Sequence, residues 1–379
     1  MAPDDTPTMR AALFDTSCAG GQGGAMVETD KNRTLFLGVI AAVLVGLLFY
    51  AMRPVVLPIV LATFFALMVR PVHRWLKRYV PSALSVTLLT ASIGAVLFAI
   101  PVMLAANIQA ILDKLPEYRP RIQAIFDEVT RVAERQFDVD LSDLHITSAD
   151  AMDSLLSVLS TSVEGAAAFL GTVVLVLFTM IFVLSETEIA RAKLALALDP
   201  ANERKVMDSV HSMREAMTRY IATKTLISFL SGLSAGLFTW ALDVDFPFVW
   251  GVLTFMLYYI PNVGATIAVV PPTLIALVQF DSPTQGVVVL ASLGVSFNLI
   301  GNVLEPRLMG RTLSISPLVV FISLIFWGWY WGFIGVILSV PLTVTVKIVC
   351  EHIDALRPIA IMLSDDPEDY RVRPGPPPG

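Results

Sequence analysis

The chain has 379 residues, of which 55% are hydrophobic and only 15% are charged, whereas soluble domains usually carry about 25% charged residues. A water-soluble core cannot hide so much apolar surface, so lipid must be the solvent for much of the chain. The net charge of −6 and the lack of a basic patch with interleaved aromatic residues argue against a nucleic-acid partner.

The N-terminal third contains three apolar runs. Residues 1–33 lack periodicity and are expected to form a disordered tail. About 20 apolar residues cross a bilayer as a helix, so residues 34–106 are predicted to hold transmembrane helices 1–3. The three runs are Thr34–Met52, Val55–Val69 and Ala83–Ala106.

A polar stretch, residues 107–164, follows the third run. Its apolar residues recur every three or four positions, beginning with Ile108, Ile111, Leu115 and Tyr118. This spacing is typical of an amphipathic helix, although two internal prolines argue against a straight coiled coil. We expect a periplasmic helical region whose apolar stripe either packs on the membrane domain of the same chain or forms an oligomer contact.

The rest of the chain alternates between apolar and polar segments. Residues 165–184 are predicted as transmembrane helix 4, 185–225 as a cytoplasmic helical segment and 226–350 as the remaining membrane core. Within that core, Leu226–Leu242 and Gln285–Leu304 have the length of a fifth and a sixth span.

Two segments of the core, 246–278 and 318–350, are too long for one straight crossing. Each has 33 residues, which would extend about 50 Å as a helix against a hydrocarbon core of about 30 Å. Proline and glycine can break such helices, and we therefore predict two re-entrant hairpins. The first segment is expected to break at Pro261–Gly264 and the second around Trp327–Gly332. The hinge candidates are Pro261, Pro271, Pro272 and Pro341.

The distribution of basic residues supports this hairpin interpretation. If the N-terminus is cytoplasmic, the linker with Arg307 and Arg311 lies inside only when each broken segment returns to the side it left. The predicted fold is an all-α polytopic membrane protein with about six transmembrane helices and two re-entrant hairpins; eight or more full spans are the alternative. Residues 351–379 are expected to be a cytoplasmic C-terminal tail.

Motifs for catalysis, metals or cofactors are nearly absent. The four histidines and two cysteines have no metal-ligand spacing, and we expect no metal, no cofactor and no enzymatic activity. Gly232–Gly236 matches the GxSxG nucleophile motif around Ser234, but it lies in an apolar span without histidine or acid. The same residues read as GxxxG, which favours close helix packing over an intramembrane hydrolase.

Polar residues within the membrane core are the candidate substrate site, because such residues are costly in lipid. Asn298, Asn302 and Glu305 share one helical face. The alternative is that the asparagines bond backbone groups freed by the proline breaks. The predicted substrate-binding residues are Asn262, Gly264, Asn298, Asn302, Trp327, Gly328, Trp331 and Gly332.

Glu305 is the candidate for proton or cation coupling, because it alone continues the polar face of a span. The alternative is an anchor at the cytoplasmic end of the span, paired with Arg307 or Arg311.

Several motifs together resemble the autoinducer-2 exporter family of permeases. They are Pro261-Asn262-Val263-Gly264, Gly301-Asn302 with Glu305-Pro306, Ser316-Pro317, Trp327–Gly332 and Pro341. The resemblance implies a bacterial inner-membrane permease with an elevator-like motion, two hairpins near the substrate and a homo-oligomer, a pentamer. It leaves open whether the substrate is a signalling molecule or whether the protein is a sodium (lithium)/proton antiporter. A non-transporting membrane scaffold is the alternative from another class.

Overall fold

The computed structural model describes residues 38, 40–41, 43–137, 169–186, 189, 192–193, 196–197, 199–261, 263–280, 282–309, 315–353 and 356–365. The chain divides into two units, Met1–Arg53 and Pro54–Gly379. In the first unit, the described residues between 38 and 51 are helical and expose large apolar side chains such as Leu44 and Leu47. Part of the expected span Thr34–Met52 lies outside the described residues.

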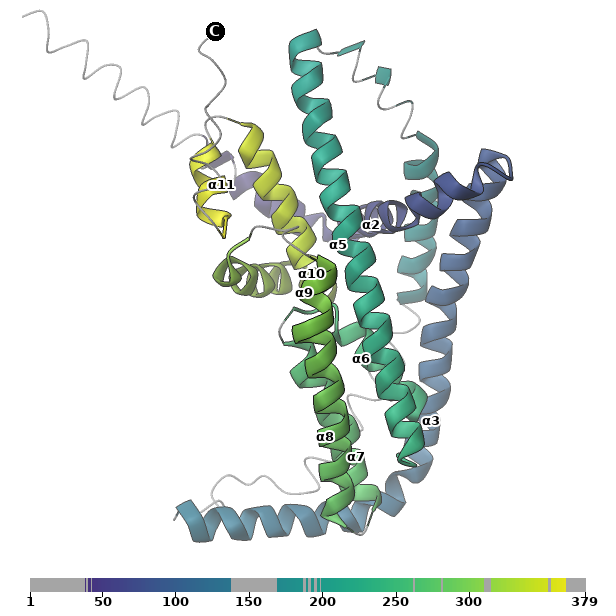
Figure 1. The fold of residues 1–379 in the computed structure, drawn as a ribbon, viewed down its shortest axis with the longest axis vertical. Helices are drawn as coiled ribbons and strands as arrows, with labels where there is room; N and C mark the ends of the chain where they lie inside the picture. Colours follow the sequence, from purple (N-terminus) through teal and green to yellow (C-terminus); the bar gives the residue numbers. More distant parts are fainter. Residues whose placement is uncertain are drawn as a thin grey trace, which may run out of the picture. The chain divides into compact units, whose positions relative to one another are not determined.

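The fold class is confirmed, because the described residues are helical apart from one isolated bridge between Ile315 and Ser364. Six of the described helices are long and apolar enough to cross a membrane (Figure 1). They are Arg53–Leu76, Ser82–Ile125, Phe169–Glu186, Val206–Ala241, Pro283–Met309 and Pro317–His352. The last of these is the second broken segment.

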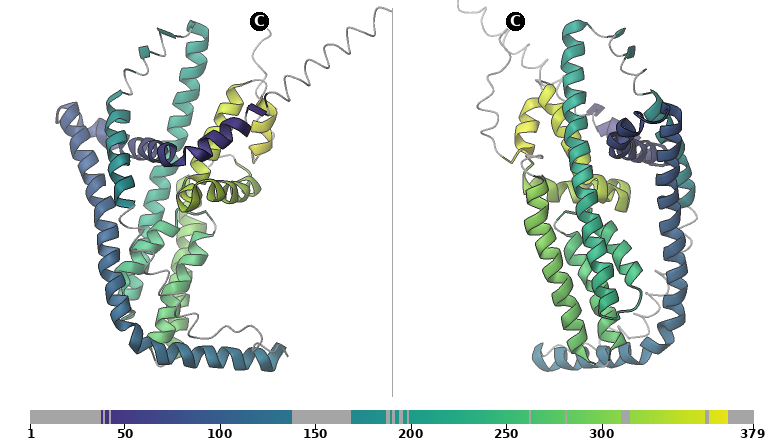
Figure 2. Two further views of the ribbon diagram at one scale, coloured as in Figure 1. Left: turned by 180° about the vertical axis from the view of Figure 1, so that it is seen from behind. Right: turned by 45° about the vertical axis from the view of Figure 1, so that its right-hand side comes forward.

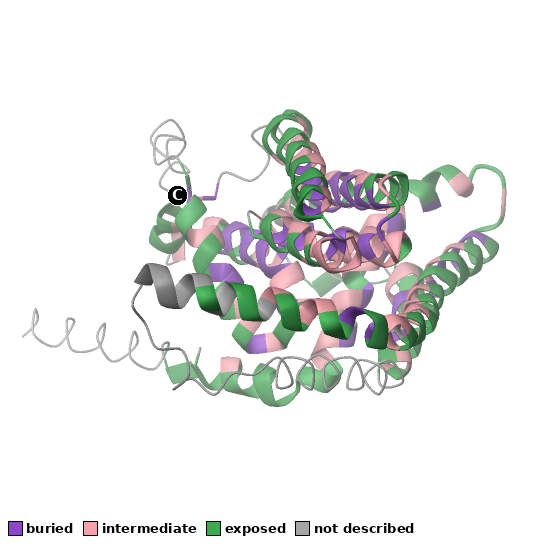
Figure 3. Ribbon diagram, turned by 90° about the horizontal axis from the view of Figure 1, so that it is seen from below, coloured by how far each residue is buried: buried purple, intermediate pink, exposed green. Residues whose placement is uncertain are grey.

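The helices expose much of their apolar surface. Figure 3 shows exposed residues along the outward faces of the helices, and on α5 (Pro200–Ala241) they include Phe229, Leu233 and Leu237, each about half exposed. A monomer in water rarely exposes such contiguous apolar surface. Lipid contact explains these faces, as the composition predicted.

The third span and the external helix are one element, α3 (Ser82–Phe137). Figure 2 shows α3 turning in its outer part, where Pro116 and Pro120 remove backbone hydrogen bonds without ending the helix. Leu115 and Tyr118 of the apolar stripe are buried within this chain, so this part of the stripe packs on its own membrane domain. Residues 138–164 of the predicted region lie outside the described residues.

Helix α5 joins the predicted cytoplasmic segment to the fifth span without a break and packs closely on α6 (Pro247–Leu257). A Cβ atom at Gly232 would lie 2.6 Å from the carbonyl oxygen of Gly251. Only glycine permits this approach, so the packing interpretation of the Gly232–Gly236 motif is confirmed.

The first broken segment is a hairpin of α6 and α7 (Gly264–Gln279). Its two ends meet, because the Gln279 side chain accepts a hydrogen bond from the Asp245 amide at 2.8 Å and donates one to the Asp243 carbonyl at 2.6 Å. The segment therefore returns to the side it left. The predicted hinges Pro271 and Pro272 lie inside α7, and the reversal occurs before them, between Leu257 and Gly264.

The second broken segment, α10 (Pro317–His352), also folds back on itself. Its helical backbone is interrupted at Gly332, where φ is 65° and ψ is −147°, whereas the predicted hinge Pro341 lies within the second arm. A Cβ atom at Gly335 would lie 1.9 Å from the Trp327 carbonyl oxygen, so the two arms approach closely at the turn.

The two ends of α10 are held together by α11 (Arg357–Leu363), which follows it. The Ser316 amide, just before the first arm, donates to the carbonyl of Leu363 at 3.2 Å. Apolar contacts repeat this arrangement, because Val319 and Val320 pack against a cluster containing Val340 and Val344 of the second arm. In both broken segments the two ends therefore lie together, as a returning path requires.

Candidate functional site

The predicted polar face of the sixth span lies at a π-helical turn. Between α8 (Pro283–Leu299) and α9 (Glu305–Met309) the chain forms a π-helical turn, η2 (Ile300–Leu304), a feature often found at functional sites. The Asn302 side chain donates a hydrogen bond to that of Asn298 at 3.2 Å. Both are exposed in the single chain, and their amides therefore remain accessible to a further partner.

Glu305 forms an ion pair that the sequence analysis did not anticipate. Its Oε1 lies 2.6 Å from Nζ of Lys224 on α5, and the two side chains are only 20% and 3% exposed. The expected partners were Arg307 or Arg311, of which Arg311 lies outside the described residues. Since Lys224 belongs to a helix that is long and apolar enough to span a membrane, this is a buried charge pair on a candidate span, the kind of feature that marks transport pathways.

Lys224 belongs to a polar face of α5 made of Tyr220, Lys224 and Ser228. The three residues are spaced by four and so lie above one another on the helix. Tyr220 and Ser228 are 5% and 0% exposed, and within the described residues their hydroxyl oxygens have no hydrogen-bond partner. Buried polar groups are normally paired, so this face has capacity for further hydrogen bonds.

Two tyrosines of the first hairpin complete the surroundings of this face. The Tyr258 hydroxyl donates to the Phe297 carbonyl at 2.9 Å, and the Tyr259 hydroxyl donates to Thr225 at 2.9 Å. The hairpin is therefore fixed to α8 by one tyrosine and to α5 by the next.

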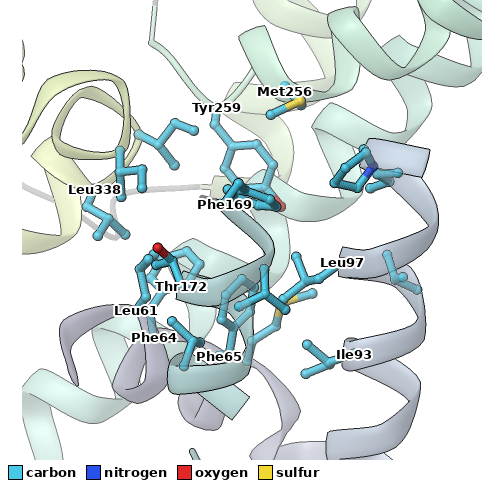
Figure 4. A pocket seen from close by; sticks show the side chains of 18 of the residues that line it. Leu61, Phe64, Phe65, Ile93, Leu97, Phe169, Thr172, Met256, Tyr259 and Leu338 are labelled. Atoms are coloured by element: carbon cyan, nitrogen blue, oxygen red, sulfur yellow. The ribbon is translucent and has the colours of Figure 1, made fainter. Parts of the chain in front are cut away.

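A cavity of about 400 Å³ lies beside the hairpins, and its lining is almost entirely apolar. Its walls come from α2 (Arg53–Leu76), α3, the helix Phe169–Glu186, α6 and the second arm of α10. Figure 4 shows Phe64, Phe65 and Leu97 facing Tyr259 and Leu338 across it.

Both hairpins border this cavity close to their turns. Met256 and Tyr259 come from the end of the first arm of the first hairpin. Phe333 and Ile334 directly follow Gly332 of the second hairpin. The residues lining the cavity include none of the predicted substrate-binding residues. This cavity therefore differs from the expected polar site between the hairpins and the sixth span, because its walls are hydrophobic and none of them comes from the sixth span.

The predicted aromatic residues form a cluster at the second turn. The rings of Trp327 and Trp331 lie 5.3 Å apart, and Nε1 of Trp327 donates to Thr343 at 3.1 Å. Nε1 of Trp331 is buried without a partner in the described part of the chain. At the first turn, Gly264 begins α7, and a Cβ there would lie 2.0 Å from the Leu257 carbonyl oxygen, while Asn262 lies outside the described residues.

A further set of contacts, the Asp245 cluster of Asp245, Lys114, Tyr118 and Trp250, joins α3 to the loop before α6. Lys114 pairs with the Asp245 carboxylate at 2.7 Å, and the Tyr118 hydroxyl donates to its second oxygen. The indole of Trp250 donates to the Asp245 carbonyl at 2.6 Å. The external helix is thereby tied to one end of the first hairpin.

Comparison with known proteins gives consistent matches over most of the chain. The model of the family described as "AI-2E family transporter" matches residues 37–355. The AI-2 transport protein TqsA of Escherichia coli K12 is 35% identical over 334 residues, covering 87% of this chain and 95% of that protein. The putative transport protein YhhT of the same strain is 32% identical over 346 residues, covering 89% and 95%. A putative transport protein of Haemophilus influenzae is 28% identical, covering 90% and 99%.

Proposed function

The chain belongs to the AI-2E transporter family and is a multi-pass membrane transport protein, and we propose that it exports a small polar solute, an autoinducer-2-like signalling molecule, across the inner membrane. The similarity to TqsA over nearly the full length of both chains carries this proposal. In the same proposal the N- and C-termini are cytoplasmic and the protein is a homo-oligomer, a pentamer.

The hairpin geometry supports a transport path between the two turns. Each hairpin has both ends on one side, and residues next to both turns border the same cavity. Helices interrupted within the membrane are how many secondary transporters present polar groups to a substrate. An elevator-like displacement of the hairpins remains part of the proposal.

The binding residues we propose are the predicted ones: Asn298 and Asn302, with the turns around Asn262–Gly264 and Trp327–Gly332. Amide groups both donate and accept hydrogen bonds and so suit the hydroxyl groups of a sugar-derived solute. The Asn298–Asn302 bond occupies one donor and one acceptor of this pair, which leaves the other amide groups free for solute.

Sodium (lithium)/proton antiport is the second candidate, and Glu305 is the observation that favours it. A partly buried carboxylate in a span can take a proton or a cation. The Lys224 ammonium, however, already occupies Oε1 at 2.6 Å, so a metal cation would have to displace it. Export of a neutral polar solute requires no such displacement.

Flux of labelled autoinducer-2 into and out of proteoliposomes tests the proposal, with and without proton or sodium gradients. We expect saturable flux for the wild type. Asn298→Leu should lower it about tenfold, as the loss of one or two substrate hydrogen bonds predicts. Asn107→Leu is the matched control, because the Asn107 amide bonds only its own helix, at Met103.

Two results would refute export of this solute. Flux that is the same in Asn298→Leu and Asn107→Leu would remove the proposed binding residues. A wild type that moves no autoinducer-2 but shows sodium- or proton-gradient exchange dependent on Glu305 would establish antiport instead.

A further inference from the structure

The ion pair of α5 has two buried hydrogen-bond acceptors beside it that it does not use. Lys224 carries three N–H donors, and one of them reaches Glu305. The hydroxyls of Tyr220 and Ser228 lie one turn before and one turn after Lys224 on the same face of α5. Both are buried and have no partner within the described residues.

We propose that Lys224 is a counter-ion with two positions, bound to Glu305 when the carboxylate is charged and to the Tyr220 and Ser228 hydroxyls when Glu305 takes up a proton. The proposal rests on the proposed transport function, because it supplies the coupling step. One proton adds to a Glu305 carboxylate oxygen, no covalent bond to carbon forms or breaks, and Lys224 keeps its three protons. The net charge of the pair changes from zero to plus one.

The second position would keep the Lys224 ammonium hydrogen-bonded once it is released from Glu305. If Glu305 were neutralised with no alternative acceptor nearby, the ammonium would be left buried and unpaired, which is strongly unfavourable. In the proposal, the hydroxyl oxygens of Tyr220 and Ser228, one helical turn to either side of Lys224, supply that alternative.

Of the groups around Glu305, Lys224 is the one that would change its hydrogen-bond partner when the charge of Glu305 changes. Besides Lys224, α5 contributes Tyr220, and the first hairpin contributes Tyr258, both of which interact with the Glu305 charge. The tyrosines are neutral hydroxyls, and Tyr258 is already bonded to a carbonyl of α8. Arg307 lies on the same element as Glu305, two residues later.

The move of Lys224 from Glu305 to the hydroxyls would be transmitted through the helices that the ion pair joins. Lys224 is on α5 and Glu305 begins α9, which continues directly from η2 and α8. The first hairpin packs on α8 and α5. Release of Glu305 from Lys224 therefore loosens the attachment of α9 to α5, next to the hairpin that is proposed to move.

The test compares Tyr220→Phe/Ser228→Ala, which removes the second position and leaves the ion pair intact, with Ser234→Ala. Ser234 is the matched control, because its hydroxyl bonds the Ser231 carbonyl of the same helix. In proteoliposomes we expect the ratio of proton-driven to downhill autoinducer-2 flux to fall at least about tenfold in the double variant. The ratio should stay at the wild-type value in Ser234→Ala.

A second measurement does not depend on the solute. Purified full-length protein in detergent is given an acid jump, and its proton uptake is recorded with an indicator dye. We expect an uptake component that Glu305→Gln abolishes and that Tyr220→Phe/Ser228→Ala reduces by more than half. Lys224→Met/Glu305→Gln, which removes both charges, should fold yet lose this component and the gradient dependence of transport.

The outcomes separate this inference from the proposed function. Equal proton uptake and equal flux ratios in the double variant and Ser234→Ala would overturn the two-position counter-ion. Retained gradient dependence in Lys224→Met/Glu305→Gln would do the same. Absence of autoinducer-2 flux in the wild type would instead overturn the proposed solute, while the proton-uptake measurement would still decide the role of Lys224.

Discussion

Replacement of Gly332 by alanine isolates the backbone geometry of the second hairpin. Its φ of 65° and ψ of −147° lie in a region that is essentially restricted to glycine, and occupying it costs other residues about 1–3 kcal/mol. A Cβ added there meets nothing within 4 Å, so no steric clash contributes. Gly332→Ala should therefore lower the free energy of unfolding by about 1–3 kcal/mol through backbone strain alone.

Gly294→Ala is the matched control for this measurement. An added Cβ at Gly294 also meets nothing within 4 Å, but Gly294 lies inside α8, where alanine is preferred over glycine by about 1 kcal/mol. Reversible unfolding in mixed detergent micelles should show that Gly332→Ala is less stable than the wild type and that Gly294→Ala is more stable. Equal stability changes in the two variants would refute the reasoning, because they would show that the turn at Gly332 has no glycine-specific conformation.

Two further substitutions test contacts that fix the first hairpin. Asp245→Asn removes the carboxylate charge that pairs with Lys114 and accepts a hydrogen bond from Tyr118. We expect the free energy of unfolding to fall by about 2 kcal/mol and hydrogen exchange in the loop before α6 to become faster. Unchanged exchange would contradict this role. Tyr258→Phe removes the 2.9 Å bond to α8 and should cost about 1 kcal/mol in the same unfolding assay, whereas an unchanged stability would show that this bond contributes nothing.

The sequence was sufficient to predict two broken apolar segments whose ends meet in the fold. Segment length against bilayer thickness identified both broken segments, and the basic residues Arg307 and Arg311 indicated that each returns to the side it left. These arguments succeed because lipid imposes simple constraints on length and charge. The turns also fall where the sequence placed the breaks, between α6 and α7 at Pro261–Gly264 and in α10 at Gly332. The other hinge candidates were wrong, because the helices continue through Pro271, Pro272 and Pro341.

The candidate site was only partly predictable, because its most buried charge pair joins distant residues. Lys224 lies at the edge of the apolar run that began at Leu226, so it was assigned to the polar segment before the fifth span. In the structure α5 is continuous there, and Lys224 meets Glu305, 81 positions away. The four-residue spacing of Tyr220, Lys224 and Ser228 was the available signal. The partner of Glu305 could not be inferred from neighbouring residues.

The apolar cavity also determines where movement would meet resistance. Its walls carry almost no polar groups. Sliding one wall past another therefore breaks few hydrogen bonds or ion pairs, and the dispersion contacts that it breaks re-form at each step. Directional contacts are found elsewhere, in the Asp245 cluster and in the Lys224–Glu305 pair. The activation barrier for such a displacement would therefore be set by a few polar contacts outside the cavity.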